Sequence, residues 1–349
     1  MHTTKTQISK RKLRSDRASD LLGVQVVSTG LFVPTNVVRN EDLAAQGFDS
    51  EWIIQRTGIK ERRHVEPGQA TSDLAIQAAK NCIESSNISV EDIDLILVAT
   101  MTPDHFTPST ACLVQASLGA TCGALDVNAA CSGFLYAMMS GSQFIKTGSM
   151  QNVLVIGAET MSMIVDPEDK KTYPLFGDGA GAVLLGADKS TDLDQASGIL
   201  SFRLASVGEL ADSVVVPGCG SRKPASAEVV DNRDQFLKMD GRTVFKWAVR
   251  TIPQIVDESL RTANLELGDL KLLIFHQANQ RILKAATEDL NISSDKIFMN
   301  VDKYGNTSAA SVAISLHEAH ENGQFQRGDH VLLAGFGAGL TWASCIFRW

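Results

Sequence analysis

Two separate segments of the chain recur at nearly the same spacing, and this repeat limits the fold more than any other feature of the sequence. The segment 86–98 (SNISVEDIDLILV) resembles 263–275 (ANLELGDLKLLIF) at an offset of 177 residues. Further along, 152–158 (NVLVIGA) resembles 330–336 (HVLLAGF) at an offset of 178 residues. Two blocks at nearly one offset indicate a duplicated unit. We therefore expect two similar halves packed against each other.

The repeated segments contain strands of a distinctive kind. The run 93–100 (IDLILVAT) is almost wholly apolar, which is typical of a strand buried on both faces. Helical patterns, such as the alanine-rich one over 72–86, separate these strands. Helices that alternate with buried strands predict an α/β fold. We expect the first half to span 23–195 and the second half 196–349.

The first 22 residues differ from the rest. Their first twenty positions carry six basic side chains and two acidic ones, Asp16 and Asp20, and they contain no hydrophobic segment of a secretory signal. We expect a disordered extension at 1–22. An organelle transit peptide and an added, non-native segment are the alternatives.

Charge and cysteine usage exclude several classes of function. The net charge is −8 and the pI about 5.4, which argues against nucleic acid or an anionic membrane as the main partner. No apolar run reaches the ~18 residues that a membrane span requires. The six cysteines show no paired spacing suited to zinc, so we expect reduced thiols in a cytoplasmic protein.

The segment 126–139 (DVNAACSGFLYAMM) predicts a strand end, a turn of small residues and then a helix. This arrangement places Cys131 at or near a helix N-terminus. Unpaired N–H groups and the helix dipole there favour a thiolate, which is the nucleophilic form of cysteine. The alternative is that Cys131 is a small buried apolar residue without reactivity.

The repeat predicts which residues share a pocket with Cys131. At an offset of 177, Cys131 corresponds to Ser308, inside a turn that contains Asn306, and His276 ends the nearby strand 270–275. A thiolate can attack a thioester carbonyl, while His and Asn can donate hydrogen bonds to an oxygen that becomes negative. The flexible glycine loop expected at 335–339 could complete an oxyanion hole with the Cys131 N–H.

Each of these residues also has a purely structural interpretation. His276 can be a structural histidine and Asn306 a helix cap. The basic residues of 56–63 can be a solvated face instead of an anion site. The glycine clusters of 177–182 and 335–339 lack the dinucleotide fingerprint, since both lead into strands. His317 and His320 lie three apart on a predicted helix, but no further metal ligands accompany them.

Taken together, the motifs resemble the β-ketoacyl-acyl-carrier-protein synthase III family, of the thiolase fold. The likeness covers 23–349 and lies in SEWIIQRTGIKER, DVNAACSGF, FGDGAGA, HQANQRI, YGNTSAAS and GFGAGLTW. The Cys-His-Asn set differs from the Cys-His-His set of elongating synthases and from the second cysteine of thiolases. The resemblance implies a thiolase-like, duplicated five-layer αβαβα fold.

The resemblance also implies an activity. The chain would be the initiating condensing enzyme of type II fatty acid synthesis, joining acyl-CoA and malonyl-acyl-carrier protein by a decarboxylative Claisen condensation through an acyl-cysteine. It would need no cofactor and no metal, would meet acyl carrier protein, and would form a homodimer with 87–98 and the Cys131 region near the interface.

Site residues follow from the same motifs. Cys131 would be the nucleophile, His276 and Asn306 would hold the malonyl thioester carbonyl, and the N–H groups of Cys131 and Ala338 would form the oxyanion hole. The remaining assignments concern coenzyme A, the pantetheine tunnel and the carrier protein. They are Trp52 and Arg56 at the nucleotide, with the basic run near Arg56 meeting the diphosphate; Gly241, Phe245 and Asn279 along the tunnel; and Arg281 at the carrier protein.

Two positions depart from the family pattern. Lys170 stands where the family has an arginine that stacks on the nucleotide, and lysine cannot stack as a plane. Thr107 stands at the position of an acyl-pocket phenylalanine, with Phe106 displaced by one. We expect this change to open the pocket to primers longer than acetyl.

Two other functions stay open at this point. One is a related acyltransferase or ketosynthase of secondary metabolism that uses the same Cys-His-Asn set. The other, of a different class, is a non-catalytic scaffold that binds acyl-CoA or a carrier protein.

Overall fold

The computed structural model describes residues 20–188, 190, 196–288, 290 and 292–349. Most of the predicted extension, 1–19, lies outside these residues. Its last residues do not form a disordered tail, because β1 (Leu21–Leu22) pairs antiparallel with β9 (Gly198–Ser206) and Leu21 is buried. The prediction that the disordered extension ends at residue 22 was therefore wrong. Leu21 and Leu22, the apolar pair at the end of that segment, belong to the second sheet.

Two sheets with matching strand order form the body of the molecule. The first runs β2 (Val24–Phe32), β8 (Asp178–Ala187), β7 (Asn152–Thr160), β5 (Leu95–Ala99) and β6 (Gly123–Val127). After its edge strand β1, the second runs β9, β15 (Thr341–Arg348), β14 (His330–Gly337), β12 (Leu270–Phe275) and β13 (Ile297–Phe298). In both sheets the last three strands are parallel and the others antiparallel.

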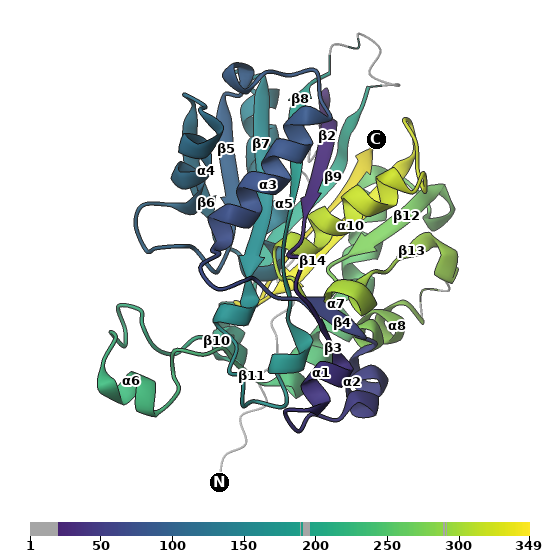
Figure 1. The fold of residues 1–349 in the computed structure, drawn as a ribbon. Helices are drawn as coiled ribbons and strands as arrows, with labels where there is room; N and C mark the ends of the chain where they lie inside the picture. Colours follow the sequence, from purple (N-terminus) through teal and green to yellow (C-terminus); the bar gives the residue numbers. More distant parts are fainter. Residues whose placement is uncertain (1–19, 189, 191–195, 289, 291) are drawn as a thin grey trace.

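Helices cover both sheets and fill the space between them (Figure 1). The central pair is α5 (Gly133–Lys146) and α10 (Ala310–Glu321), which contact both sheets. α3 (Thr71–Glu84) and α4 (Thr110–Leu118) cover the outer face of the first sheet, and α7 (Gly241–Ala263) and α8 (Gln280–Glu288) that of the second. The result is the five-layer αβαβα arrangement of a duplicated α/β fold.

The central layer explains the apolar strands and one of the glycine motifs. The largest core cluster joins residues of α5 and α10 to strands of both sheets, so the strands are buried on both faces. A Cβ on Gly181 would lie 2.6 Å from Ala313 Cβ and 2.7 Å from Ala313 C. The glycines of FGDGAGA therefore let α10 approach β8, which is a packing function and involves no nucleotide.

Smaller elements surround the end of the molecule where the halves meet. From the first half they are β3 (Val37–Arg39), α1 (Asn40–Ala44), α2 (Ser50–Thr57) and β4 (Glu61–Arg63). From the second they are β10 (Val214–Val215), α6 (Ala227–Asp231), β11 (Lys238–Met239) and α9 (Val301–Tyr304). The segment that carries α6 projects from the body (Figure 1).

α7 begins at Gly241 because the Asp240 carboxylate accepts hydrogen bonds from the N–H groups of Arg242 and Thr243. One local expectation needs correction. Gly335–Gly337, expected in a flexible loop, belong to β14 and pair with β15. None of the helices in the described residues is long and apolar enough to cross a membrane.

Candidate active site

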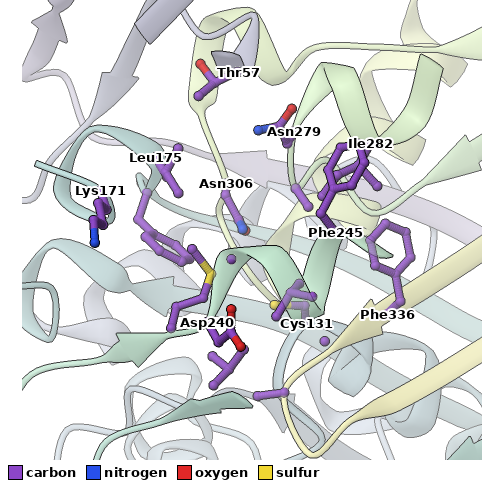
Figure 2. A pocket seen from close by; sticks show the side chains of 18 of the residues that line it. Thr57, Cys131, Lys171, Leu175, Asp240, Phe245, Asn279, Ile282, Asn306 and Phe336 are labelled. Carbon is purple, nitrogen blue, oxygen red and sulfur yellow. The ribbon is translucent and has the colours of Figure 1, made fainter. Parts of the chain in front are cut away.

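A cavity of about 770 Å³ opens where the two halves meet (Figure 2). Residues from both halves line it, and most of the predicted site residues are among them. These are Trp52, Arg56, Cys131, Gly241, Phe245, His276, Asn279, Arg281, Asn306 and Ala338. Phe245 and Phe336 stand on one side of the view, and Lys171 and Leu175 on the other.

The turn that carries Cys131 follows β6 directly. Asn128 Oδ1 accepts a hydrogen bond from the Ala130 N–H at 3.2 Å, and Ala130 has a φ of +46°. Cys131 follows in a 3₁₀ turn over Ala130–Ser132 that leads into α5. The cysteine therefore lies at a helix N-terminus, as the sequence predicted.

The protonation state of Cys131 differs from the expectation. Loss of solvation, with a smaller contribution from the negative charge of Glu159, raises the pKa of the thiol to about 12. The Ser308 side chain and the backbone of Cys131 and Ala338 lower the pKa, but by less than burial raises it. Cys131 is thus a thiol, because desolvation outweighs the effect of the helix terminus.

A second turn with the same geometry carries Asn306. Asn306 Oδ1 accepts a hydrogen bond from the Ser308 N–H at 2.9 Å, and Ser308 has a φ of +46°. The segment is fixed to the first half by two backbone hydrogen bonds, from the Asn306 N–H to Leu175 O (2.8 Å) and from the Gly177 N–H to Asn306 O (3.1 Å).

The two turns correspond at an offset of 178, one more than the sequence comparison gave. A Cβ on Gly157 would lie 2.5 Å from Ala309 O, and a Cβ on Gly335 would lie 3.2 Å from Cys131 O. Cys131 therefore corresponds to Ala309, and Ser308 corresponds to Ala130. The strands before the turns match at 177 and those after them at 178, so only the structure fixes the register of the turns.

The hydrogen bond within the Asn306 turn orients its amide. Because Oδ1 is held by the Ser308 N–H, the Nδ2 group is left to face the cavity as a donor. Asn306 is 8% exposed, and that exposure is to the cavity. The side chain is thus set to donate a hydrogen bond to a bound carbonyl oxygen.

His276 is the residue after β12 and is buried at the cavity wall. Its Nδ1 lies 2.5 Å from Ser311 Oγ, and that hydroxyl oxygen also accepts from the Gln277 N–H at 3.4 Å. We assign the hydroxyl hydrogen to Nδ1, which places the ring hydrogen on Nε2. Burial lowers the pKa of His276 to about 3, so the ring is a neutral donor toward the cavity.

Ser311 was not identified from the sequence, although it lies within YGNTSAAS. Its contact with His276 joins residues 35 apart in the chain, and no local pattern indicates it. The group that orients His276 is therefore a hydroxyl and not a carboxylate.

Glu159 was also missed. It lies near the end of β7 and is fully buried. One carboxylate oxygen accepts from Ser308 Oγ at 2.9 Å and from the Ala309 N–H at 3.3 Å, and the other accepts from Thr102 Oγ1 at 2.7 Å. Burial raises the pKa of Glu159 to about 7. The sequence did contain a signal for Glu159: it is a lone acidic residue directly after the apolar run 152–158.

The backbone at the end of β14 approaches Cys131 closely. A Cβ on Gly337 would lie 2.7 Å from Cys131 N and 2.8 Å from Cys131 Cβ. Only glycine fits there without displacing the turn. The backbone of the next residue, Ala338, and that of Cys131 itself both lower the pKa of the thiol. Both backbone groups therefore lie near the reactive atom.

Of the four basic residues within 56–63, one lines the cavity and three stabilise the surrounding structure. Arg56 lines the cavity. Arg62 is fully buried and donates to Asn40 Oδ1 and Pro174 O, both at 2.8 Å. Lys60 pairs with Asp302 at 3.3 Å, and Arg63 pairs with Glu61 at 3.3 Å. The interpretation of the whole run as an anion site was wrong, because burial and local ion pairs use three of its charges.

Other basic residues replace that run at the cavity. Lys171, Arg242, Lys246 and Arg281 join Arg56 in its lining, and Asp240 is the single acidic side chain among the lining residues. Lys170, the predicted substitute for an arginine, is turned away and donates to Gly47 O at 2.8 Å. The cavity therefore has a basic entrance built from both halves.

Three further predicted residues lie elsewhere. Phe106 is 88% exposed, and Thr107 beside it is exposed too, so neither lines the cavity of the single chain. His317 Nδ1 lies 2.9 Å from Thr29 Oγ1, and the ring of His320 packs 4.9 Å from that of Trp349. Within the described ranges no group of three His, Cys, Asp or Glu residues is arranged to hold a metal.

Comparison with known proteins gives one consistent result. Residues 125–208 match the family model for 3-oxoacyl-[acyl-carrier-protein] synthase III, and 260–349 match the model for its C-terminal part. A β-ketoacyl-[acyl-carrier-protein] synthase III from Rhodopirellula baltica is 52% identical over 343 residues, covering 95% of this chain and 99% of that protein.

Solved structures agree with this result. The 3-oxoacyl-[acyl-carrier-protein] synthase III from Aquifex aeolicus is 44% identical with a TM-score of 0.86, covering 94% of this chain and 100% of that one. The priming β-ketosynthase of the R1128 polyketide pathway is 30% identical with a TM-score of 0.85, covering 95% of this chain and 98% of that one.

Proposed function

The chain belongs to the β-ketoacyl-acyl-carrier-protein synthase III family of condensing acyltransferases, and we propose that it performs the family reaction with Cys131, His276 and Asn306. The convergence of these three side chains on one cavity carries the proposal. The substrates are an acyl-CoA and malonyl-acyl-carrier protein, and the products are β-ketoacyl-carrier protein, CoA and CO₂.

The first step transfers the acyl group. The Cys131 sulfur attacks the thioester carbonyl of acyl-CoA, and the carbonyl oxygen becomes negative in the tetrahedral intermediate. The N–H groups of Cys131 and Ala338 stabilise that oxygen, which is supported by their position beside the sulfur. The carbon–sulfur bond to CoA then breaks, and the acyl group stays on Cys131.

The second step forms the carbon–carbon bond. His276 Nε2–H and Asn306 Nδ2–H both donate to the thioester carbonyl of the malonyl group, so they stabilise the enolate that the loss of CO₂ leaves. A neutral His276 with a free Nε2–H supports this role. The enolate carbon attacks the acyl-cysteine carbonyl, and the Cys131 sulfur leaves.

The basic entrance fits the phosphates of both substrates. Arg56 and Trp52 on α2 contact the CoA nucleotide, and Lys171 supplies the cation that we expected from Lys170. Gly241, Phe245 and Asn279 line the pantetheine arm. Arg281 on α8 contacts the carrier protein, whose phosphopantetheine enters along the same path.

Several broader properties belong to the same proposal. The enzyme works in the cytoplasm without a cofactor or metal and forms homodimers. The edge strand β6, where Leu125 is 45% exposed, and the exposed Phe106 nearby support an interface on this side of the first sheet. Primers longer than acetyl are accepted, which is supported by Thr107 at the position of the family's acyl-pocket phenylalanine.

A secondary-metabolism role is the second candidate, because a priming polyketide ketosynthase is 30% identical to this chain. The relative from Rhodopirellula baltica is 52% identical and favours the fatty acid synthase. The intact set of Cys131, His276 and Asn306 weighs against a non-catalytic scaffold.

The deciding experiment measures the intact mass of the protein after incubation with acyl-CoAs from acetyl to C12, for the wild type and Cys131→Ala. We expect one acyl adduct on the wild type only, which malonyl-carrier protein then discharges with release of CO₂. Acylation without discharge would favour a simple acyltransferase, and no adduct from any acyl-CoA would favour the scaffold. Acylation no faster with C6–C12 than with acetyl-CoA would contradict the open acyl pocket.

A further inference from the structure

The direction of the Asn306 amide depends on the backbone of the residues that follow it. Asn306 Oδ1 accepts from the Ser308 N–H at 2.9 Å, so a shift of the Ser308 backbone also moves the Nδ2 donor. Ser308 has a φ of +46°, a left-handed conformation that a serine keeps only when its surroundings hold it there. Backbone bonds to Leu175 and Gly177 fix the beginning of the turn. Its end, at Ser308 and Ala309, needs a contact of its own.

Glu159 supplies that contact from the other half of the molecule. Its Oε1 accepts a hydrogen bond from the Ser308 hydroxyl at 2.9 Å and from the Ala309 N–H at 3.3 Å. All three residues are fully buried. A buried N–H that loses its acceptor destabilises the conformation in which it is left unpaired. The carboxylate therefore stabilises the end of the turn in the observed conformation.

The carboxylate is itself held in place by the segment that follows β5. Its Oε2 accepts from the Thr102 hydroxyl at 2.7 Å, from the Thr102 N–H at 3.1 Å and from Thr100 Oγ1 at 3.2 Å. The Met101 N–H lies 3.2 Å from Oε1 and 3.1 Å from Oε2. All of these groups donate to Glu159, which suits a carboxylate better than an amide. Glu159 thus connects a fixed segment of the first half to the Asn306 turn of the second half.

We propose that Glu159 is a positioning residue for Asn306. By fixing Ser308 and Ala309, it keeps the Asn306 Nδ2 group directed at the malonyl carbonyl. Glu159 is not among the residues that line the cavity, so it acts through the turn and does not touch the substrate. The inference rests on the proposed function and deepens it, because it gives the decarboxylation step a further residue.

The turn that carries Cys131 has contacts that do not involve Glu159. Ser132 Oγ donates to Ala129 O at 2.8 Å, and Thr341 Oγ1 lies 2.7 Å from Ser132 Oγ. The negative charge of Glu159 raises the pKa of the Cys131 thiol, so removal of that charge does not disfavour the nucleophile. We therefore expect a Glu159 variant to impair decarboxylation and to spare acylation.

The first test is Glu159→Gln, which keeps the size of the side chain but places an amide N–H₂ group among donors. The kcat for decarboxylation of malonyl-carrier protein should fall about tenfold and KM should change less than about twofold, because the Asn306 donor acts in the transition state. Acylation by acyl-CoA, followed by intact mass, should change less than about threefold. Equal losses of both partial reactions would mean general damage to the fold and would overturn the inference.

A double-mutant cycle tests whether Glu159 acts through Asn306. In the Asn306→Ala background, Glu159→Gln should lower the rate of decarboxylation by less than about twofold, because the donor that it positions is already absent. If the two losses multiply instead, Glu159 acts on some other group and the inference is wrong.

The matched control is Asp178→Asn, which changes another buried carboxylate in the same way. Asp178 lies on the neighbouring strand β8 and accepts from the N–H groups of Ser162 and Val65, both at 2.8 Å. Both donors belong to the first half. Decarboxylation should change less than about threefold in this variant. A tenfold loss here as well would show that the position of Glu159 has no special effect.

Ser308→Ala keeps the inference testable if Glu159→Gln does not fold. Ala130 has the same φ in the equivalent turn, so alanine fits this conformation. The variant removes one of the two bonds between Glu159 and the turn and should slow decarboxylation about threefold, the effect of one ordinary hydrogen bond. Acylation should not change. Decarboxylation at the wild-type rate would refute the link between Glu159 and Asn306.

Failure of the proposed function gives a different result. A wild-type protein that does not decarboxylate malonyl-carrier protein would reject that function, and crystal structures of the wild type and Glu159→Gln then decide the inference. We expect the bond between Asn306 Oδ1 and the Ser308 N–H to be lost in the variant. An Asn306 turn that is the same in both structures would overturn the positioning role.

Discussion

The two turns at the centre of the molecule have the same backbone and different roles. Each begins with an Asn whose side chain accepts from the N–H two residues on, and each has a residue with φ of +46°, Ala130 or Ser308. Each then enters a central helix, α5 or α10, and each is approached by a glycine of the opposite half. The duplication thus produced the same turn-and-helix arrangement in both halves.

The difference lies at the ends of two equivalent strands. Glu159 on β7 corresponds, at an offset of 178, to Gly337 on β14. The Glu159 carboxylate accepts from the Ala309 N–H, whereas Gly337 has no side chain to accept from the equivalent N–H of Cys131. The Cys131 N–H therefore stays available to a substrate oxygen, and Gly337 lets the backbone of Ala338 come near.

A second difference concerns the strands that precede the turns. His276 corresponds to Ala99, and Ser311 corresponds to Gly133, whose Cβ position lies 3.4 Å from Ala99 Cβ. The second half therefore has a polar His–Ser pair where the first has two small apolar residues. One half carries the nucleophile and the other carries the donors, so the site requires both halves.

The largest expected effect comes from Gly337→Ala. The added Cβ would lie 2.7 Å from Cys131 N, so the nucleophile turn must shift. Because a displacement of about 1 Å can cost about 10²-fold in rate, acylation should fall by at least that factor. The control is Gly208→Ala, where nothing lies within 4 Å of the added Cβ. Acylation rates by intact mass decide this, and an unchanged rate for Gly337→Ala would refute the close approach.

The next test compares Asn306→Ala with Asn128→Ala. Both lose the same hydrogen bond within a turn, so each should lower the free energy of unfolding by about 1 kcal/mol. Only Asn306→Ala removes a donor to the malonyl carbonyl, and it should reduce decarboxylation about 10² -fold. Urea unfolding and CO₂ release measure the two effects. If both variants lost decarboxylation alike, the division of roles between the halves would be wrong.

A smaller effect is expected from Ser311→Ala, which leaves the buried Nδ1 of His276 without its partner. A buried polar group that loses its partner costs about 1–3 kcal/mol. If about 1.4 kcal/mol of this cost falls on the transition state, decarboxylation should be about tenfold slower. Ser142→Ala on α5, which loses a hydroxyl contact to Met138 O at 2.8 Å, is the matched change in the first half. Decarboxylation that drops equally in Ser142→Ala would point to packing alone.

The smallest effect concerns the two buried histidines. Burial lowers the pKa of His64, in the first half, to about 4, while its ring packs 5.7 Å from that of Tyr173. A lowered folded pKa gives stability that is present above pH 6.5 and is lost as the pH falls toward 4. His64→Phe should therefore reduce the loss of unfolding free energy between pH 7.5 and pH 5 by about 2 kcal/mol.

Urea unfolding of the wild type and His64→Phe at the two pH values measures this contribution. Activity should be retained, because His64 does not line the cavity, in contrast to His276. An equal loss of stability with falling pH in both proteins would show that His64 is not neutral in the folded state.

Much of the fold depends on local sequence patterns and could be predicted from the sequence. The apolar runs predicted the buried strands, the repeat predicted two halves, and the small-residue turn after 125–127 placed Cys131 at a helix N-terminus. The motifs named Cys131, His276 and Asn306 as one site. Hydrophobic periodicity and turn chemistry are properties of neighbouring residues, so one sequence suffices to show them.

Other decisions required the tertiary structure. The contact between Glu159 and Ser308 joins residues 149 apart, and the contact between His276 and Ser311 joins residues 35 apart. Arg62 is buried and stabilises the fold, and Lys171 lines the cavity where Lys170 was expected. Both outcomes depend on burial and side-chain direction, which only packing determines. The state of the Cys131 thiol depends on desolvation against hydrogen bonds, a balance that exists only once the two halves enclose the sulfur.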